Sequence, residues 1–89
     1  MADDTERLKR AAAEIRERLA GFFDDFDATE RSNDIVQALA IYRGNDPIGD
    51  IREMLEPRKG HAGIEGAERR AAAAVECYRV WLRSARARR

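Results

Sequence analysis

The clearest pattern of apolar and polar positions lies in residues 67–87, which contain no Gly or Pro. One set of positions in this stretch follows a 4-3-4-3-4 spacing: Ala67, Ala71, Ala74, Tyr78, Trp81 and Ala85. Because an α-helix turns by about 100° per residue, these positions fall on one side of a helix. Arg79, Arg83 and Arg86 form a separate basic side, which we call the arginine stripe. The pattern predicts a long C-terminal helix, over about residues 66–87, whose arginine stripe faces water.

A third side of the same predicted helix is made of small or apolar residues: Ala73, Cys77, Val80 and Ser84. Short side chains let another helix approach closely, since the distance between packed helices depends on the residues at the contact. Two such sides predict that the C-terminal helix lies at the centre of the fold, with neighbours on both. The small-residue side is filled either by another helix of the same chain or by a second copy of the chain in a two-fold dimer.

The N-terminal part of the chain repeats this spacing with larger residues: Leu8, Ala12, Ile15, Leu19, Phe22 and Phe26. Gly21 interrupts the pattern at a cost of about 1 kcal/mol relative to Ala. Because the repeat continues past Gly21, we expect one helix over about residues 4–26. Two matched apolar sides pack well at a shallow crossing angle. We therefore expect the first helix to lie against the last one and to shield Tyr78 and Trp81 from water.

A second helix is predicted over about residues 28–43. Asp27 and Glu30 are spaced as in a capping box, which satisfies backbone amides at the start of a helix. The second half of this segment is apolar at almost every position, which indicates a buried helix. Gly44 follows at the position where a helix commonly ends.

A short third helix is predicted over about residues 47–56, with Asp46 as its N-cap and Pro47 at its first position. Pro57 ends it, because a proline disfavours helical geometry in the residue before it. The Gly-rich residues 57–65 are expected to form an irregular loop before the last helix.

Composition and length limit the fold to a small one. The chain has 89 residues, of which 44% are hydrophobic and 38% are charged. This is enough for one compact core with a thin margin of stability, and no stretch alternates as a strand would. The expected fold is all-α: a single domain over residues 1–89, arranged as a compact four-helix bundle with a short third helix and a central C-terminal helix.

Charge is unevenly distributed along a chain whose formal net charge is zero. Residues 1–34 carry ten acidic and six basic side chains, a balance of −4, whereas residues 67–89 carry two acidic and seven basic ones, a balance of +5. An acidic front and a basic end can pair within one chain, pair between two chains, or meet other partners.

The chain offers few groups for catalysis or for cofactor binding. Cys77 is the only cysteine and His61 the only histidine, and they lie on different predicted elements, so the sequence indicates no Cys–His pair. Phosphate-binding and nucleophile-elbow motifs are missing. We therefore expect no enzyme activity, no cofactor and no metal. No segment has the length of a membrane span or the pattern of a signal peptide, and a cytoplasmic location is expected.

The acidic front contains one dense run of carboxylates: Asp24, Asp25, Asp27, Glu30 and Asp34. A calcium-binding EF-hand loop that started at Asp25 would need Gly at position 30 and Glu at position 36, where the chain has Glu30 and Val36. Carboxylates are also favoured at the positive end of a helix, which explains the run without a metal.

The sequence leaves three functions open. The leading interpretation is a small non-catalytic protein-binding or regulatory module that docks on a partner protein, with a homodimer through the C-terminal helix as one form. Its expected contact residues are the arginine stripe, Val80 and the acidic run. The first alternative is nucleic-acid binding through the basic C-terminal helix. The second is an acidic inhibitor that imitates phosphates and blocks a nucleic-acid-binding protein.

Overall fold

The computed structural model describes residues 2–58, 60 and 62–86, and within these ranges it contains four α-helices and no strand. The helices are α1 (Ala2–Leu19), α2 (Asp25–Ala40), α3 (Pro47–Met54) and α4 (Ala67–Arg86). The predicted all-α fold with a short third helix is confirmed.

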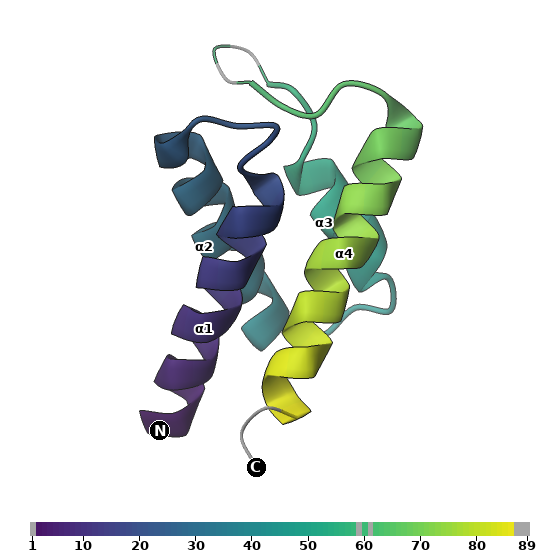
Figure 1. The fold of residues 1–89 in the computed structure, drawn as a ribbon. Coiled ribbons are helices and arrows are strands. Elements are labelled where there is room, and N and C mark those ends of the chain that lie inside the picture. The colour runs from purple at the N-terminus through teal and green to yellow at the C-terminus, as the bar shows by residue number, and fades with distance from the viewer. Residues whose placement is uncertain (1, 59, 61, 87–89) are drawn as a thin grey trace.

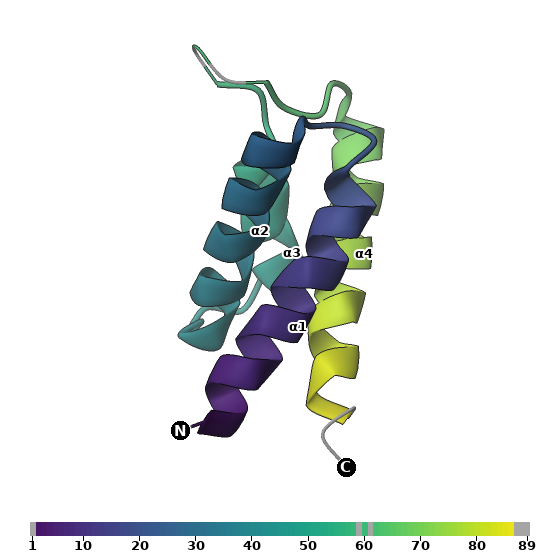
Figure 2. The ribbon, with the colours of Figure 1, turned by 60° about the vertical axis from the view of Figure 1, so that its left-hand side comes forward.

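The C-terminal helix has neighbours on two sides, as the sequence predicts. Helix α4 packs against both α1 and α3, and α1 packs against both α2 and α4. Helix α1 runs in one direction while α2 and α4 run back (Figures 1 and 2). The start of α1 and the end of α4 therefore lie at the same end of the bundle, which we call the terminal end. The α1–α2 turn and the loop before α4 lie at the opposite end of the bundle, which we call the turn end.

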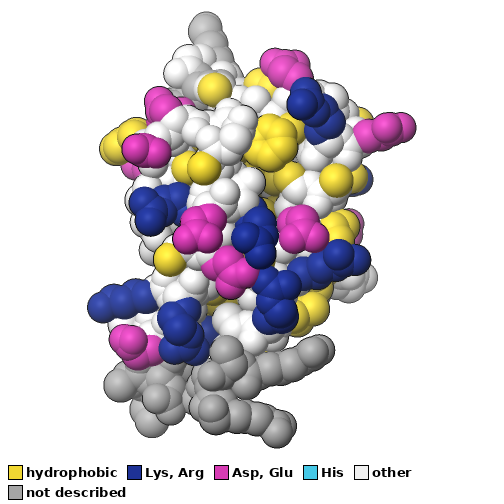
Figure 3. All heavy atoms as spheres, in the orientation of Figure 1, with side chains coloured by type: hydrophobic (Ala, Val, Ile, Leu, Met, Phe, Trp, Pro, Cys, Tyr) yellow, Lys and Arg dark blue, Asp and Glu magenta, His cyan; other side chains and the backbone are white. Residues whose placement is uncertain are grey.

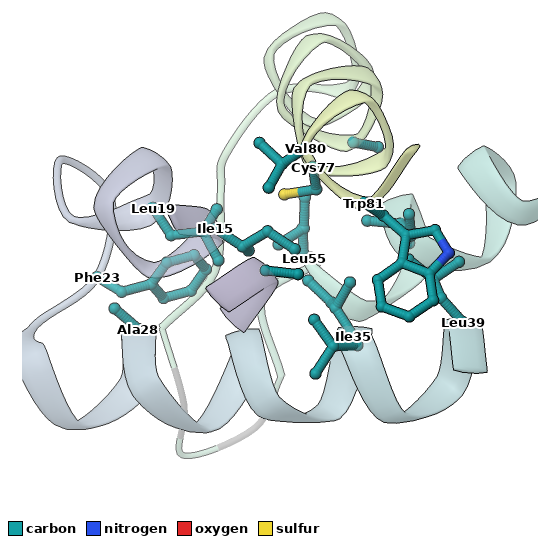
Figure 4. Packing of buried hydrophobic residues seen from close by; sticks show 14 of the residues in the cluster. Ile15, Leu19, Phe23, Ala28, Ile35, Leu39, Leu55, Cys77, Val80 and Trp81 are labelled. Carbon is teal, nitrogen blue, oxygen red and sulfur yellow. The ribbon is translucent and has the colours of Figure 1, made fainter. Parts of the chain in front are cut away.

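The core lies where the helices meet, and every helix contributes to it. Its largest fully buried side chains are Ile15, Leu19, Ile35, Ile51, Leu55, Ile64 and Val80. Figure 4 shows the residues of α1, α2 and α4 pointing toward one another in this cluster. Each large apolar side chain contributes about 1.5–3 kcal/mol when it is fully buried, so packing of these residues is the main stabilising force.

The expected shielding of the aromatic residues on α4 is confirmed for Trp81 and is partial for Tyr78. Trp81 is 8% exposed, and Tyr78 is half-buried against the core. Trp81 lies at the Leu39 side of the cluster in Figure 4, and Leu19 lies at the opposite side. The ring is drawn next to Leu39 of α2 in this view, and the Arg7 guanidinium on α1 stacks on it.

The first helix ends at Leu19, so the prediction that it continues to residue 26 is wrong. The amides of Phe22 and Phe23 both donate to the Leu19 carbonyl, at 3.0 and 3.1 Å, and these bonds close a turn around Gly21. The turn buries Phe23, whereas Phe22 stays 40% exposed and Phe26 stays 69% exposed. Burial of Phe23, which lies outside the repeat, favours the turn over a longer helix.

The second helix begins at Asp25 because Asp24, not Asp27, is its N-cap. The Asp24 carboxylate accepts a hydrogen bond from the Asp27 amide at 2.8 Å. An aspartate in this position stabilises a helix by about 1 kcal/mol. The capping role predicted for Asp27 therefore belongs to the residue three positions earlier.

The second helix ends at Ala40, and Gly44 lacks the positive φ of a helix-ending glycine. Gly44 instead makes room for Tyr42, since a Cβ at position 44 would lie 2.6 Å from the Tyr42 hydroxyl oxygen. That hydroxyl accepts a hydrogen bond from the Asp46 amide at 2.7 Å. Helix α2 therefore ends three residues before the predicted position, and the Tyr42 hydrogen bond links its end to the start of α3.

The start of the third helix is as predicted. The Asp46 carboxylate accepts from the Gly49 amide at 3.0 Å, and Pro47 is the first residue of α3. Helix α3 ends at Met54, and the following loop is fixed by buried Ile64, whose amide donates to the Leu55 carbonyl at 2.8 Å. No helix in the described ranges is long and apolar enough to cross a membrane.

Candidate functional site

The arginine stripe lies in an ion-pair network that links α4 to α1. The Glu14 carboxylate on α1 pairs with Arg18 at 3.0 Å and also contacts Arg83 on α4. Glu76 on α4 pairs with Arg18 at 3.6 Å and with Arg79 at 3.3 Å. Figure 3 shows acidic and basic side chains interleaved across the face that α1 and α4 share. All five side chains are partly exposed, so each pair contributes at most about 1 kcal/mol.

This network changes the interpretation of the stripe. Arg79 and Arg83 pair with carboxylates of the same chain, and a phosphate would have to compete with Glu14 and Glu76 for them. Arg86 belongs to α4, but its side chain lies outside the described residues. Nucleic-acid binding through this helix stays a prediction.

Most of the small-residue side of α4 is filled by the same chain. Val80 is 1% exposed, and Cys77 and Ser84 are also buried. In this fold the Val80 side chain packs within the chain, so we leave it out of the partner surface proposed below. Ala73, at the turn end of the same side, is only half-buried and lines a pocket described below.

Cys77 is also unsuited to act as a nucleophile. Burial, with a smaller contribution from Glu76, raises the pKa of its thiol from the ordinary 9.0 to about 12. The thiol therefore stays protonated at neutral pH, and only the thiolate is reactive.

The acidic run surrounds an exposed aromatic ring. Asp24, Asp25, Glu30 and Asp34 are exposed, and Asp27 is half-buried at the first turn of α2. Phe26 lies among them and is the most exposed of the three phenylalanines. We call Asp24, Asp25, Phe26 and Asp27 the acidic aromatic end of α2. The run therefore lies along the first half of α2, and its role in partner binding stays a prediction. Phe26, which the sequence pattern assigned to the core of the first helix, is instead exposed within the run.

One signal in the sequence could have revealed the exposure of Phe26. In a helix that begins at Asp25, Phe26 shares its side with Glu30 and Asn33, which lie four and seven residues later. That side of α2 is polar and faces water. The assignment depends on choosing Asp24 as the N-cap.

Two arginines that the sequence reasoning did not single out hold the fold together. Arg31 is buried and donates to the Met54 carbonyl at the end of α3 and to the Ala62 carbonyl at 2.8 Å. Its guanidinium also lies 5.3 Å from the ring centroid of Phe23. Charged donors make stronger hydrogen bonds than neutral ones, so Arg31 links α2 to α3 and to the following loop.

Arg7 links two helices, α1 and α4, at the terminal end of the bundle. Its guanidinium stacks 3.6 Å from the ring centroid of Trp81. It also donates to the Ser84 hydroxyl and to the Trp81 carbonyl, both at 2.8 Å. Arg7 thereby covers the aromatic residue of α4 and joins the first turns of α1 to the last turns of α4.

A pocket of about 290 Å³ opens between α1 and α4 at the turn end. It is lined by four apolar residues, Leu19, Phe22, Ala72 and Ala73, and by three charged residues that we call its rim, Arg18, Arg69 and Glu76. Arg69 is exposed and makes no hydrogen bond or ion pair with the described part of the chain. We call this the α1–α4 pocket.

Potential metal ligands do not cluster in the part of the chain that the structure describes. Within residues 2–58, 60 and 62–86, no three His, Cys, Asp or Glu side chains lie close enough together to hold an ion, and His61 lies outside these ranges.

The chain matches no known family model, no curated protein and no solved structure.

Proposed function

We propose that the chain is a small non-catalytic protein-binding module that docks on a partner through the acidic aromatic end of α2. The observation that carries the proposal is the 69% exposure of Phe26 among three aspartates. A phenyl ring has no polar atom to hydrate, and its full burial is favourable by about 1.5–3 kcal/mol. Aromatic residues are enriched at protein interfaces for this reason.

The surface also specifies the chemistry of its partner. A ring flanked by carboxylates fits an apolar pocket that has cations at its rim. Glu30 and Asp34 continue the negative charge along the same exposed part of α2, so they extend the contact as the sequence analysis expects. Docking of this kind is steered by charge and weakens as salt rises.

The arginine stripe is not part of the proposed docking surface. Arg79 already pairs with Glu76 on α4, and Arg83 pairs with Glu14 on α1, which links the two helices. The proposal includes the cytoplasmic location expected from the sequence.

Photo-crosslinking in the native cells tests the proposal. A benzophenone-bearing phenylalanine analogue is placed at position 26 in one chain and, as a matched control, at position 41 in another. Ile41 is 77% exposed at the opposite end of α2, so it reports chance collisions. The proposal predicts a discrete protein adduct from position 26 and none from position 41. Equal labelling from both positions, or none from position 26, contradicts it.

A further inference from the structure

The partner surface that Phe26 requires is present on this chain. The α1–α4 pocket is an apolar pocket with Arg18 and Arg69 at its rim. We propose that the partner is a second copy of the chain, with Phe26 of each copy inserted into the α1–α4 pocket of the other. This inference rests on the proposed function and deepens it by naming the partner.

The size and lining of the pocket suit a phenyl ring. A cavity of about 150 Å³ is large enough to hold benzene, and the α1–α4 pocket has about 290 Å³. Ala72 and Ala73 have short side chains that leave room for an incoming helix end, and Phe22 offers a 40% exposed ring to stack on. Aromatic pairs of this kind are favourable beyond the area that they bury.

The charges on the two surfaces are complementary. Asp25 on the acidic aromatic end has no ion-pair partner in the described part of the chain, and neither has Arg69 at the pocket rim. The one carboxylate in the pocket, that of Glu76, is already paired with Arg18 and Arg79. The incoming aspartates therefore meet a rim with an unpaired cation.

The position of the two surfaces permits a closed pair. Phe22, in the pocket wall, and Phe26 are only four residues apart at the turn end of the bundle. Every copy carries one ring and one pocket, so a two-fold axis creates two identical junctions and leaves neither surface unused. The formal net charge of zero means that two copies do not repel each other as a whole.

Sedimentation over a range of concentrations tests the inference with the full chain. The wild type is expected to shift from 10.1 kDa toward twice that mass as concentration rises. Phe26→Ser removes the ring and should raise the dissociation constant at least thirtyfold, the effect of truncating a central interface residue, about 2 kcal/mol or more. Ile41→Ser is the matched control and should dimerise like the wild type. Equal dimerisation by Phe26→Ser overturns the inference.

A charge exchange identifies the predicted contact. Asp25→Arg and Arg69→Glu should each weaken dimerisation about tenfold, because like charges then face each other. The double variant restores an opposite-charge pair at the same place and should recover most of the affinity. If the double variant is as weak as the sum of its parts, Asp25 and Arg69 do not meet and the docking geometry is wrong.

Failure of this inference can be distinguished from failure of the proposed function. A wild-type chain that stays monomeric at every concentration, together with a crosslink from position 26 to a different protein, overturns self-docking and leaves the docking module intact. The absence of any specific crosslink at position 26 overturns both.

Discussion

The two ends of the α1–α4 pair differ in how far they bury an aromatic side chain. At the terminal end, Arg7 stacks on Trp81 and bonds its carbonyl, and Trp81 is 8% exposed. At the turn end, Phe22 stays 40% exposed beside Arg69, whose side chain lines the pocket without closing it. A cation from the same chain thus completes the core at the terminal end, whereas at the turn end Arg69 leaves the ring of Phe22 open to solvent.

Replacing Trp81 and replacing Phe22 should give the largest difference in the free energy of unfolding. Trp81→Ala is expected to lower the free energy of unfolding by about 3–5 kcal/mol, because it leaves a cavity in the core. Phe22→Ala should cost about 1 kcal/mol, because the ring is part of an open surface. Urea denaturation of both variants measures the difference, and equal losses would show that the turn end is as closed as the terminal end.

Replacing the arginine at the terminal end, Arg7, should destabilise the fold more than replacing the arginine at the turn end, Arg69. Arg7→Ala removes the stacking on Trp81 and two charge-assisted hydrogen bonds, and it should lower the free energy of unfolding by about 2 kcal/mol. Arg69→Ala should change it by no more than about 0.5 kcal/mol. Chemical denaturation at low chain concentration, where the chain is monomeric, checks both values. A destabilising Arg69→Ala variant would remove the distinction between the two ends.

Cys77, in the middle of α4 between the two ends, reports through its titration whether water reaches the core there. The pKa of Cys77 is raised from 9.0 in its ordinary state to about 12 in the fold, so the folded chain favours the protonated thiol. Its contribution to stability is full below pH 9 and is lost as the pH rises toward 12. At pH 10.5 the wild type should have lost about 2 kcal/mol through this group.

The control for this prediction is Cys77→Ala, which has no thiol to titrate. The difference in unfolding free energy between the wild type and Cys77→Ala should shrink between pH 8 and pH 10.5. A constant difference over this interval would mean that water reaches the thiol in the folded chain.

The smallest expected effect concerns the turn that creates the open end. A Cβ at Gly21 would meet no atom within 4 Å, and its φ is not positive. Gly21→Ala should therefore raise the free energy of unfolding by about 0.4–1 kcal/mol, without extending α1. Backbone chemical shifts measure the helix end, and a helix that continues to Phe26 in this variant would show that Gly21, rather than burial of Phe23, makes the turn.

Local signals and periodicity were enough to predict most of the fold. Asp46 and Pro47 mark the start of α3 because capping depends on neighbouring residues only. The burial of Trp81 follows from the spacing of apolar residues in a long helix without Gly or Pro. The end of α1 was missed because Phe26 continues the apolar repeat by position although it belongs to the next helix.

The candidate site was predicted only in part, for physical reasons. Four of the five carboxylates of the acidic run are exposed and Asp27 is half-buried, and the run lies at the start of α2, where negative charge is favoured. The roles of Arg7 and Arg31 depend on which ring and which carbonyls lie within reach of a long side chain, and a charge pattern does not encode that. The α1–α4 pocket is a gap between elements about fifty residues apart, so it becomes visible only when the helices are packed.

Fluorine NMR of the chain, with all three phenylalanines replaced by a fluorinated analogue, tests the central claim most directly. Phe23 is buried and should be shielded from a soluble paramagnetic probe at every concentration, so it serves as the internal reference. Self-docking through Phe26 predicts that the Phe26 signal is strongly broadened by the probe in dilute solution and becomes protected as the chain is concentrated. A Phe26 signal that is equally broadened at both concentrations would contradict self-docking through this ring.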